Sequence, residues 1–157
     1  MNRALLTIAL IALLNQTNAI AEANRLNVLQ ATADRDTTQL AQLLAYGADV
    51  DSTDANGNTA LMLAAAYDYA DVTAILVAAG ANVNVAGHIG NTALVYAAQS
   101  GAAEVARLLI EAGAHVGTVN DFGNSARGLA NGYGHRDIVH LIDSTPTPTA
   151  GALALAF

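Results

Sequence analysis

The chain has 157 residues, of which 54% are hydrophobic, and this is enough for one domain with a buried core. It contains no Cys, which excludes disulfides, thiolate metal sites and cysteine nucleophiles. The formal net charge is −7 and the six basic residues are all Arg, so the composition disfavours binding to a nucleic acid and favours a basic protein partner.

The chain opens with a largely apolar run over residues 4–14, which follows Arg3. Ala19-Ile20-Ala21 then supplies small residues at the two positions that a signal peptidase reads. The run is too short to span a bilayer, which takes about 20 residues. The pattern predicts a secretory signal peptide over residues 1–21, cut after Ala21, and therefore a periplasmic or secreted protein without a stable membrane anchor. A buried first helix and an uncleaved signal anchor are the alternatives.

Several residue patterns recur along the chain at one fixed interval, which is the separation between Gly57 and Gly90 and which we call the period. The recurring positions are Gly57-Asn-Thr-Ala-Leu and Gly90-Asn-Thr-Ala-Leu; Gly47, Gly80 and Gly113; and Val72, Val105 and Ile138. A fixed period of this length is typical of a solenoid, in which each unit buries its apolar face only against its neighbours.

The apolar spacing within one period predicts the structure of the unit. Residues 59–66 are expected to form a short helix that begins at a capping Thr hydroxyl. Residues 71–79 are expected to form a second helix, which ends at Gly80. Alternating valines in residues 81–90 favour an extended hairpin. The unit is therefore helix, turn, helix, hairpin.

Gly57-x-Thr59-Ala60-Leu61-Met62-x-Ala64-Ala65 resembles the ankyrin-repeat motif Gly-x-Thr-Pro-Leu-His-x-Ala-Ala. Gly134-His135-Arg136-Asp137-Ile138-Val139 is similar to the Gly-His-x-x-Val-Val of the same family. The resemblance implies an all-α ankyrin-repeat solenoid over residues 22–143, with about four helix-turn-helix-hairpin units and atypical capping ends. Residues 144–157 are expected to form a Thr/Pro linker and a short apolar tail.

This chain departs from the family motif in each of its two central units. Ala60 and Ala93 replace the family Pro, while Met62 and Val95 replace the family His, which ties neighbouring units together by hydrogen bonds. We therefore expect apolar packing alone at these positions and a stack held mainly by apolar contacts.

An acidic cluster spans Asp49–Asp54 and superficially resembles a calcium-binding loop. Asp54 stands where such a loop requires Gly and no Glu closes the loop, so we interpret the acids as turn residues. The histidines lack the spacing of a helical metal pair, and no nucleophile motif accompanies them; they are His88, His115, His135 and His140. We expect no catalytic residue, metal or cofactor.

The family resemblance also implies a binding face. Partners of ankyrin stacks bind to hairpin tips and to the exposed ends of the first helices, which line a concave face. Large side chains at such exposed sites supply most interface energy, although Phe122 and Ile89 could instead cover the edge of the core. The candidate partner-binding residues are Asn56, Tyr67, His88, Ile89, Asp121, Phe122 and Tyr133. Three further tyrosines, Tyr46, Tyr69 and Tyr96, are expected to be packing residues.

The sequence thus predicts an exported, non-catalytic, monomeric protein that binds a protein partner. The resemblance permits a role in stress protection or in neutralising a toxin. Two other functions stay open: a metal-dependent protein or enzyme that uses the Asp49–Asp54 cluster with His88 and Asp121, and a structural homo-oligomer built through the exposed ends of the stack.

Overall fold

The computed structural model describes residues 28–145. Residues 28–33 are helical, and seven helices follow: α2 (Thr37–Ala45), α3 (Ala60–Ala66), α4 (Ala70–Ala78), α5 (Ala93–Ser100), α6 (Ala103–Glu111), α7 (Ala126–Tyr133) and α8 (Arg136–Asp143). The predicted all-α class is confirmed. The predicted signal peptide, residues 1–21, and residues 146–157 of the predicted tail lie outside the described residues.

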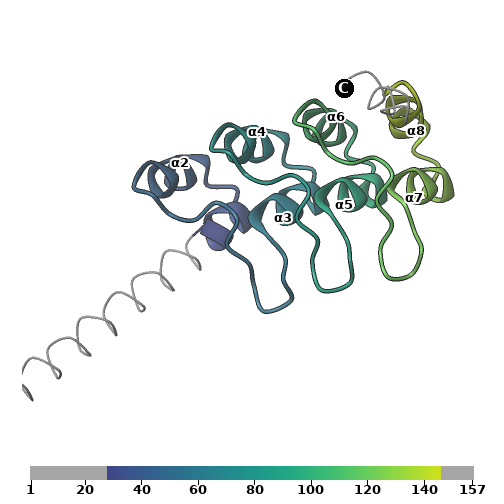
Figure 1. Ribbon diagram of the computed structural model, residues 1–157. Helices are drawn as coiled ribbons and strands as arrows, with labels where there is room; N and C mark the ends of the chain where they lie inside the picture. The colour runs from purple at the N-terminus through teal and green to yellow at the C-terminus, as the bar shows by residue number, and fades with distance from the viewer. Residues whose placement is uncertain (1–27, 146–157) are drawn as a thin grey trace, which may run out of the picture.

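The helices form two layers (Figure 1). Helices α3, α5 and α7 pack against one another in one row, and α2, α4, α6 and α8 form a second row, which lies above the first in the figure. Three loops project beyond the first row; we call them the finger loops and place them at residues 49–58, 82–91 and 115–124. This arrangement repeats one helix pair and one finger loop per unit, as the period of the sequence predicted.

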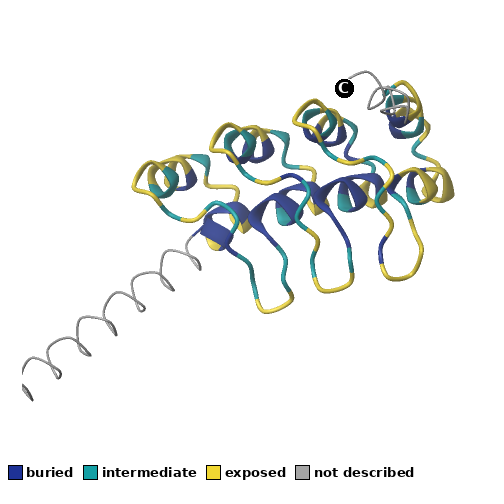
Figure 2. Ribbon diagram, in the orientation of Figure 1, coloured by how far each residue is buried: buried dark blue, intermediate teal, exposed yellow. Residues whose placement is uncertain are grey.

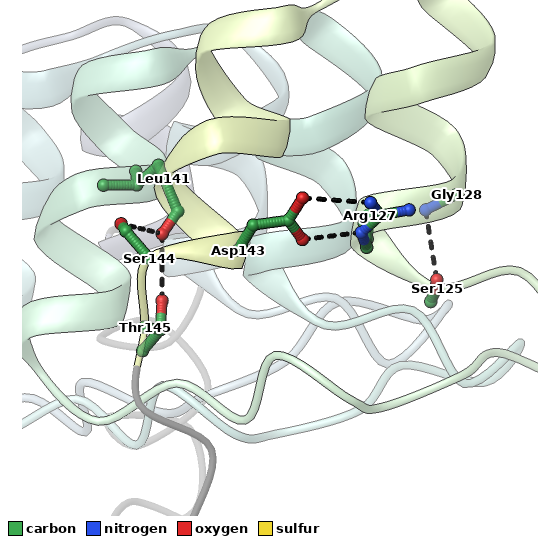
Figure 3. A network of polar contacts seen from close by, with 7 residues as sticks. All are labelled: Ser125, Arg127, Gly128, Leu141, Asp143, Ser144 and Thr145. Atoms are coloured by element: carbon green, nitrogen blue, oxygen red, sulfur yellow. Dashed lines mark hydrogen bonds and ion pairs between the residues drawn. The ribbon is translucent and has the colours of Figure 1, made fainter.

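The helices of the first row begin at hydroxyl caps. Thr59 accepts a hydrogen bond from the Met62 amide at 3.3 Å, and Thr92 accepts one from the Val95 amide at 3.4 Å. In the last unit Ser125 accepts from the Gly128 amide at 3.1 Å, as Figure 3 shows. These bonds satisfy amides that have no partner within the helix, which is why Thr or Ser recurs at this position.

The core lies between the two rows, where Figure 2 shows the buried helix faces. Met62 and Val95 are each only 1% exposed, so the positions where the family has His are filled by apolar packing, as predicted. Their neighbours Leu61 and Leu94 are equally buried, at 2% and 1%. Burying side chains of this size contributes about 1.5–3 kcal/mol each, which makes apolar contact the main stabilising term.

Hydrogen bonds between neighbouring units add to these apolar contacts, which the sequence did not lead us to expect. The Ser100 hydroxyl on α5 donates to the carbonyl oxygen of Ala65 on α3 at 3.0 Å. In the finger loops, the Asn120 side-chain amide donates to the side-chain oxygen of Asn91 at 2.8 Å. The two Asn side chains are buried, and such pairing avoids the cost of an unsatisfied polar group.

The predicted extended hairpin over residues 81–90 is wrong. The segment contains two turns, closed by bonds from the Val85 amide to the Asn82 carbonyl at 3.3 Å and from the Gly90 amide to the Gly87 carbonyl at 2.9 Å. Some of its amides bond to the preceding finger loop instead; the Asn82 amide donates to the Asp51 carboxylate at 2.9 Å. The Gly87 amide donates to the Asn91 carbonyl at 2.9 Å across the tip, but residues 81–90 contain no strand.

The last unit is closed by polar contacts of α8 (Figure 3). Arg127 on α7 makes two hydrogen bonds to the Asp143 carboxylate, at 2.6 and 2.9 Å. The hydroxyls of Ser144 and Thr145 both donate to the Leu141 carbonyl, at 2.8 and 3.0 Å. They satisfy a carbonyl that lacks a partner at the helix end.

Candidate functional site

The finger loops are joined to one another by backbone hydrogen bonds near their tips. The His88 amide donates to the Asn56 carbonyl at 3.3 Å, and the Asp121 amide donates to the Ile89 carbonyl at 3.1 Å. The two donors are one period apart, as are the two acceptors, so the same bond is made twice. The loops therefore lie side by side, and their tips share one edge of the molecule (Figure 1).

Four connected hollows lie between the finger loops and the helices α3, α5 and α7. Their volumes are about 260, 310, 370 and 80 Å³. Adjoining hollows share the lining residues Ile89, Tyr96 and Gln99. We call this continuous depression the groove. It is lined by Asn56, Asn58, Met62, Leu63, Ala66, His88, Ile89, Asn91, Tyr96, Gln99, Ser100, Asn120, Phe122, Asn124, Leu129 and Tyr133.

Five of the candidate partner-binding residues line the groove. Ile89, Phe122 and Tyr133 surround the hollow of about 260 Å³ and are 44%, 73% and 58% exposed. Asn56 and His88 line the adjoining hollow together with Ile89. The exposure of Phe122 is too large for a side chain that covers the core, which was the alternative interpretation.

The other two candidates lie beside the groove. Tyr67 stacks on Tyr69 with 5.6 Å between ring centroids and lines none of the four hollows. Asp121 packs against the neighbouring finger loop, where its Oδ1 atom is 3.0 Å from the position of a Cβ built on Gly90. Tyr67 therefore extends the apolar surface at the end of α3. The Asp121 side chain contacts the neighbouring finger loop.

Comparison with protein families tests the resemblance directly. A family model described as ankyrin repeats, in three copies, matches residues 5–87, 28–120 and 76–147. The chain belongs to the ankyrin-repeat family. Ankyrin repeats generally mediate protein–protein interaction and are typically non-catalytic. The comparison with curated proteins gives no match.

Tyr96 lines the groove of this ankyrin-repeat protein, although its sequence context predicts a packing residue. It lines three of the four hollows, and its hydroxyl donates to the Asn58 side-chain oxygen at 3.3 Å. Its place in the repeat indicates the same position, because Leu63 and Leu129 stand one period before and one period after it and also line the groove. The ring packs partly against the core, so its position serves both purposes.

The other two tyrosines of that group differ from each other. Tyr69 is a packing residue as predicted, with the Arg35 guanidinium carbon 5.1 Å from the centroid of its ring. Tyr46 is not, because it is 90% exposed at the end of α2, outside the groove.

The acids of the Asp49–Asp54 cluster order the first ankyrin finger loop from within. Asp49 accepts a bond from the Asp51 amide at 3.0 Å, and Asp54 accepts bonds from the amides of Asn56 and Asn58, both at 2.8 Å. Burial alone would raise the pKa of Asp54, but the bonds from Asn58 and Asn56 and the nearby His88 hold it below its ordinary value. These contacts support the interpretation as turn residues.

Two further observations concern metals and membranes. Within residues 28–145, no group of three or more His, Cys, Asp or Glu side chains could hold a metal ion. In the same part of the chain, every helix is too short or too polar to cross a membrane.

Proposed function

We propose that this ankyrin-repeat protein is exported, is not a catalyst and binds a protein partner through its groove. The observation that carries the proposal is the convergence of Ile89, Phe122 and Tyr133 on one hollow while all three stay exposed. A finger loop gains nothing for its own folding by exposing a Phe, whereas buried aromatic side chains supply much of the energy of protein interfaces.

Export is supported by the apolar run of residues 4–14 and by Ala19-Ile20-Ala21. The exported protein is then expected to begin at Glu22, which N-terminal sequencing or intact mass measures directly. Changing Ala21→Asp should block cleavage, and the matched change Ala21→Ser should allow it. A full-length N-terminus in the wild-type protein from the cell envelope or medium would contradict a cleavable signal.

A basic partner is favoured by the net charge of −7. Charges spread over a surface mainly accelerate encounter, while the contacts in the groove determine which segment is held. A toxin with a positively charged surface would fit this charge, so identifying the partner distinguishes toxin neutralisation from stress protection.

The experiment is a pull-down from the periplasmic or secreted fraction of the native host. The purified wild-type protein is compared with the double variant Phe122→Ala and Tyr133→Ala, and with Tyr46→Ala as the control, since Tyr46 is an exposed aromatic residue outside the groove. We expect the same partner with wild type and control and its loss with the double variant. Equal recovery by all three proteins would place binding elsewhere.

A further inference from the structure

The groove is uncharged although the protein is strongly acidic. Its lining contains no Arg, Lys, Asp or Glu, and His88 is its one titratable side chain besides the tyrosines. Arg35, Arg107 and Arg127 instead form ion pairs at surface sites outside the groove. A charged segment that entered the groove would lose hydration without gaining an opposite charge, so the lining selects an uncharged one.

Amide side chains recur along the groove once per unit. Asn58, Asn91 and Asn124 follow one another at intervals of one period; Asn58 lines two of the hollows, and Asn91 and Asn124 line a third together. The side-chain oxygen of Asn91 accepts a bond from Asn120, so Asn91 presents its NH₂ group as a donor. The side-chain oxygen of Asn58 likewise accepts a bond from the Tyr96 hydroxyl, and its NH₂ group donates one hydrogen to Asp54 and keeps the other. Donors of this kind suit a chain whose backbone carbonyls have no partners of their own.

The spacing of the units favours one conformation for that chain. Packed helices lie about 8–10 Å apart, so equivalent groups of neighbouring units recur at about that distance. A polyproline II helix has three residues per turn and rises about 3.1 Å per residue, so it presents the same face about every 9.3 Å. A β-strand presents the same face about every 6.7 Å, from its rise of about 3.3 Å per residue.

The aromatic lining also suits proline. Tyr96, Phe122 and Tyr133 line the hollows beside the amide row. Aromatic-lined grooves recognise the preformed polyproline II conformation, which loses little entropy when it binds. We propose that the groove binds an uncharged, proline-rich segment of its protein partner in the polyproline II conformation. This inference rests on the proposed function and specifies its ligand.

The test compares three nonapeptides with acetylated and amidated ends by NMR titration of the full protein. One contains three Pro-Leu-Pro triplets, one contains three Ser-Leu-Ser triplets, and one contains three Lys-Leu-Lys triplets. We expect the proline peptide to bind at least about tenfold more tightly than the other two, because its conformation is already ordered. Binding of the proline peptide should change little between low and moderate salt.

Variants identify where the proline peptide binds. Phe122→Ala changes an exposed side chain and should weaken binding at least about tenfold without unfolding the protein, while Tyr46→Ala should leave binding unchanged. Equal affinity for the serine peptide, or no loss with Phe122→Ala, would overturn the inference. So would the absence of binding by any peptide, although the pull-down would still test the proposed function independently.

One outcome would contradict the proposed ligand without contradicting the proposed binding face. Tighter binding of the lysine peptide that is lost with Phe122→Ala would overturn the uncharged ligand and retain the groove as the binding face.

The chain's own segment of residues 145–149 is uncharged and contains Pro146 and Pro148. If changing both prolines to Ser strengthens binding of the proline peptide, the segment competes for the groove, which supports the chemistry proposed here.

Discussion

Replacing Gly101 by Ala tests how the turn between paired helices fixes the position of the next unit. Gly101 ends α5 with φ of +78°, in the left-handed region. A Cβ at this position would lie 2.6 Å from Cε1 of His135 and 2.8 Å from its Nδ1 atom. The His135 ring stacks on Tyr133 with 6.3 Å between ring centroids, so moving the ring disturbs a second contact.

The free-energy cost of Gly101→Ala has two parts, and the equivalent substitution in the last unit measures one of them alone. Gly134 is the equivalent residue one period later, with φ of +83° and, apart from its chain neighbours, no atom within 4 Å of a built Cβ. Gly134→Ala should therefore lower the free energy of unfolding by about 1–2 kcal/mol, the cost of a left-handed Ala. Gly101→Ala carries the same cost and about 1–3 kcal/mol more, because the His135 ring must move.

Urea unfolding followed by far-UV circular dichroism measures both changes, since the chain has no Trp for fluorescence. The double variant Gly101→Ala with His135→Ala should recover most of the additional loss relative to His135→Ala alone. Equal destabilisation by Gly101→Ala and Gly134→Ala would refute the role given to His135.

Three other predictions concern the finger loops and the state of association. Lowering the pH should destabilise the protein as Asp54 is protonated, because hydrogen bonds hold the pKa of Asp54 below its ordinary value. The contribution of ionised Asp54 to the free energy of unfolding is complete above about pH 4 and is lost as the pH falls through the folded pKa. Asp54→Asn should reduce this acid sensitivity in urea unfolding and keep the loop, since Asn120 accepts the equivalent bonds in the third finger loop; an unchanged pH profile would contradict this. Replacing EDTA with calcium should leave the melting temperature unchanged within about 1 °C, while a saturable rise that Asp51→Ala abolishes would favour the metal-dependent alternative. Light scattering should give the mass of one chain, and a concentration-independent oligomer would favour assembly through the ends of the stack.

The fold could be predicted because its determinants are local and repeat. Thr59 caps α3, and Gly80 follows the end of α4 in the left-handed region, so sequence spacing alone placed these two helices to within one residue. The finger loops could not be predicted in the same way. Their hydrogen bonds join residues about one period apart, as between Asp51 and Asn82, and alternating valines carry no information about that pairing.

The candidate site was predicted in part for a related reason. Ile89 and Phe122 stand out in the sequence because a solvated loop does not need them, and the structure places them around one hollow. Tyr96 did not stand out, because an aromatic residue within an apolar helix is expected to pack against the core. Its place in the groove depends on the neighbouring unit, which presents Asn58 to its hydroxyl.

Photocrosslinking in living cells tests the binding face most directly. A photoreactive phenylalanine analogue is placed at Phe122 in the groove or at Tyr46 outside it, where the side chains are 73% and 90% exposed. We predict one discrete adduct with a partner protein from position 122, in the periplasmic or secreted fraction, and none from position 46. An adduct from position 46 with none from position 122 would contradict binding through the groove.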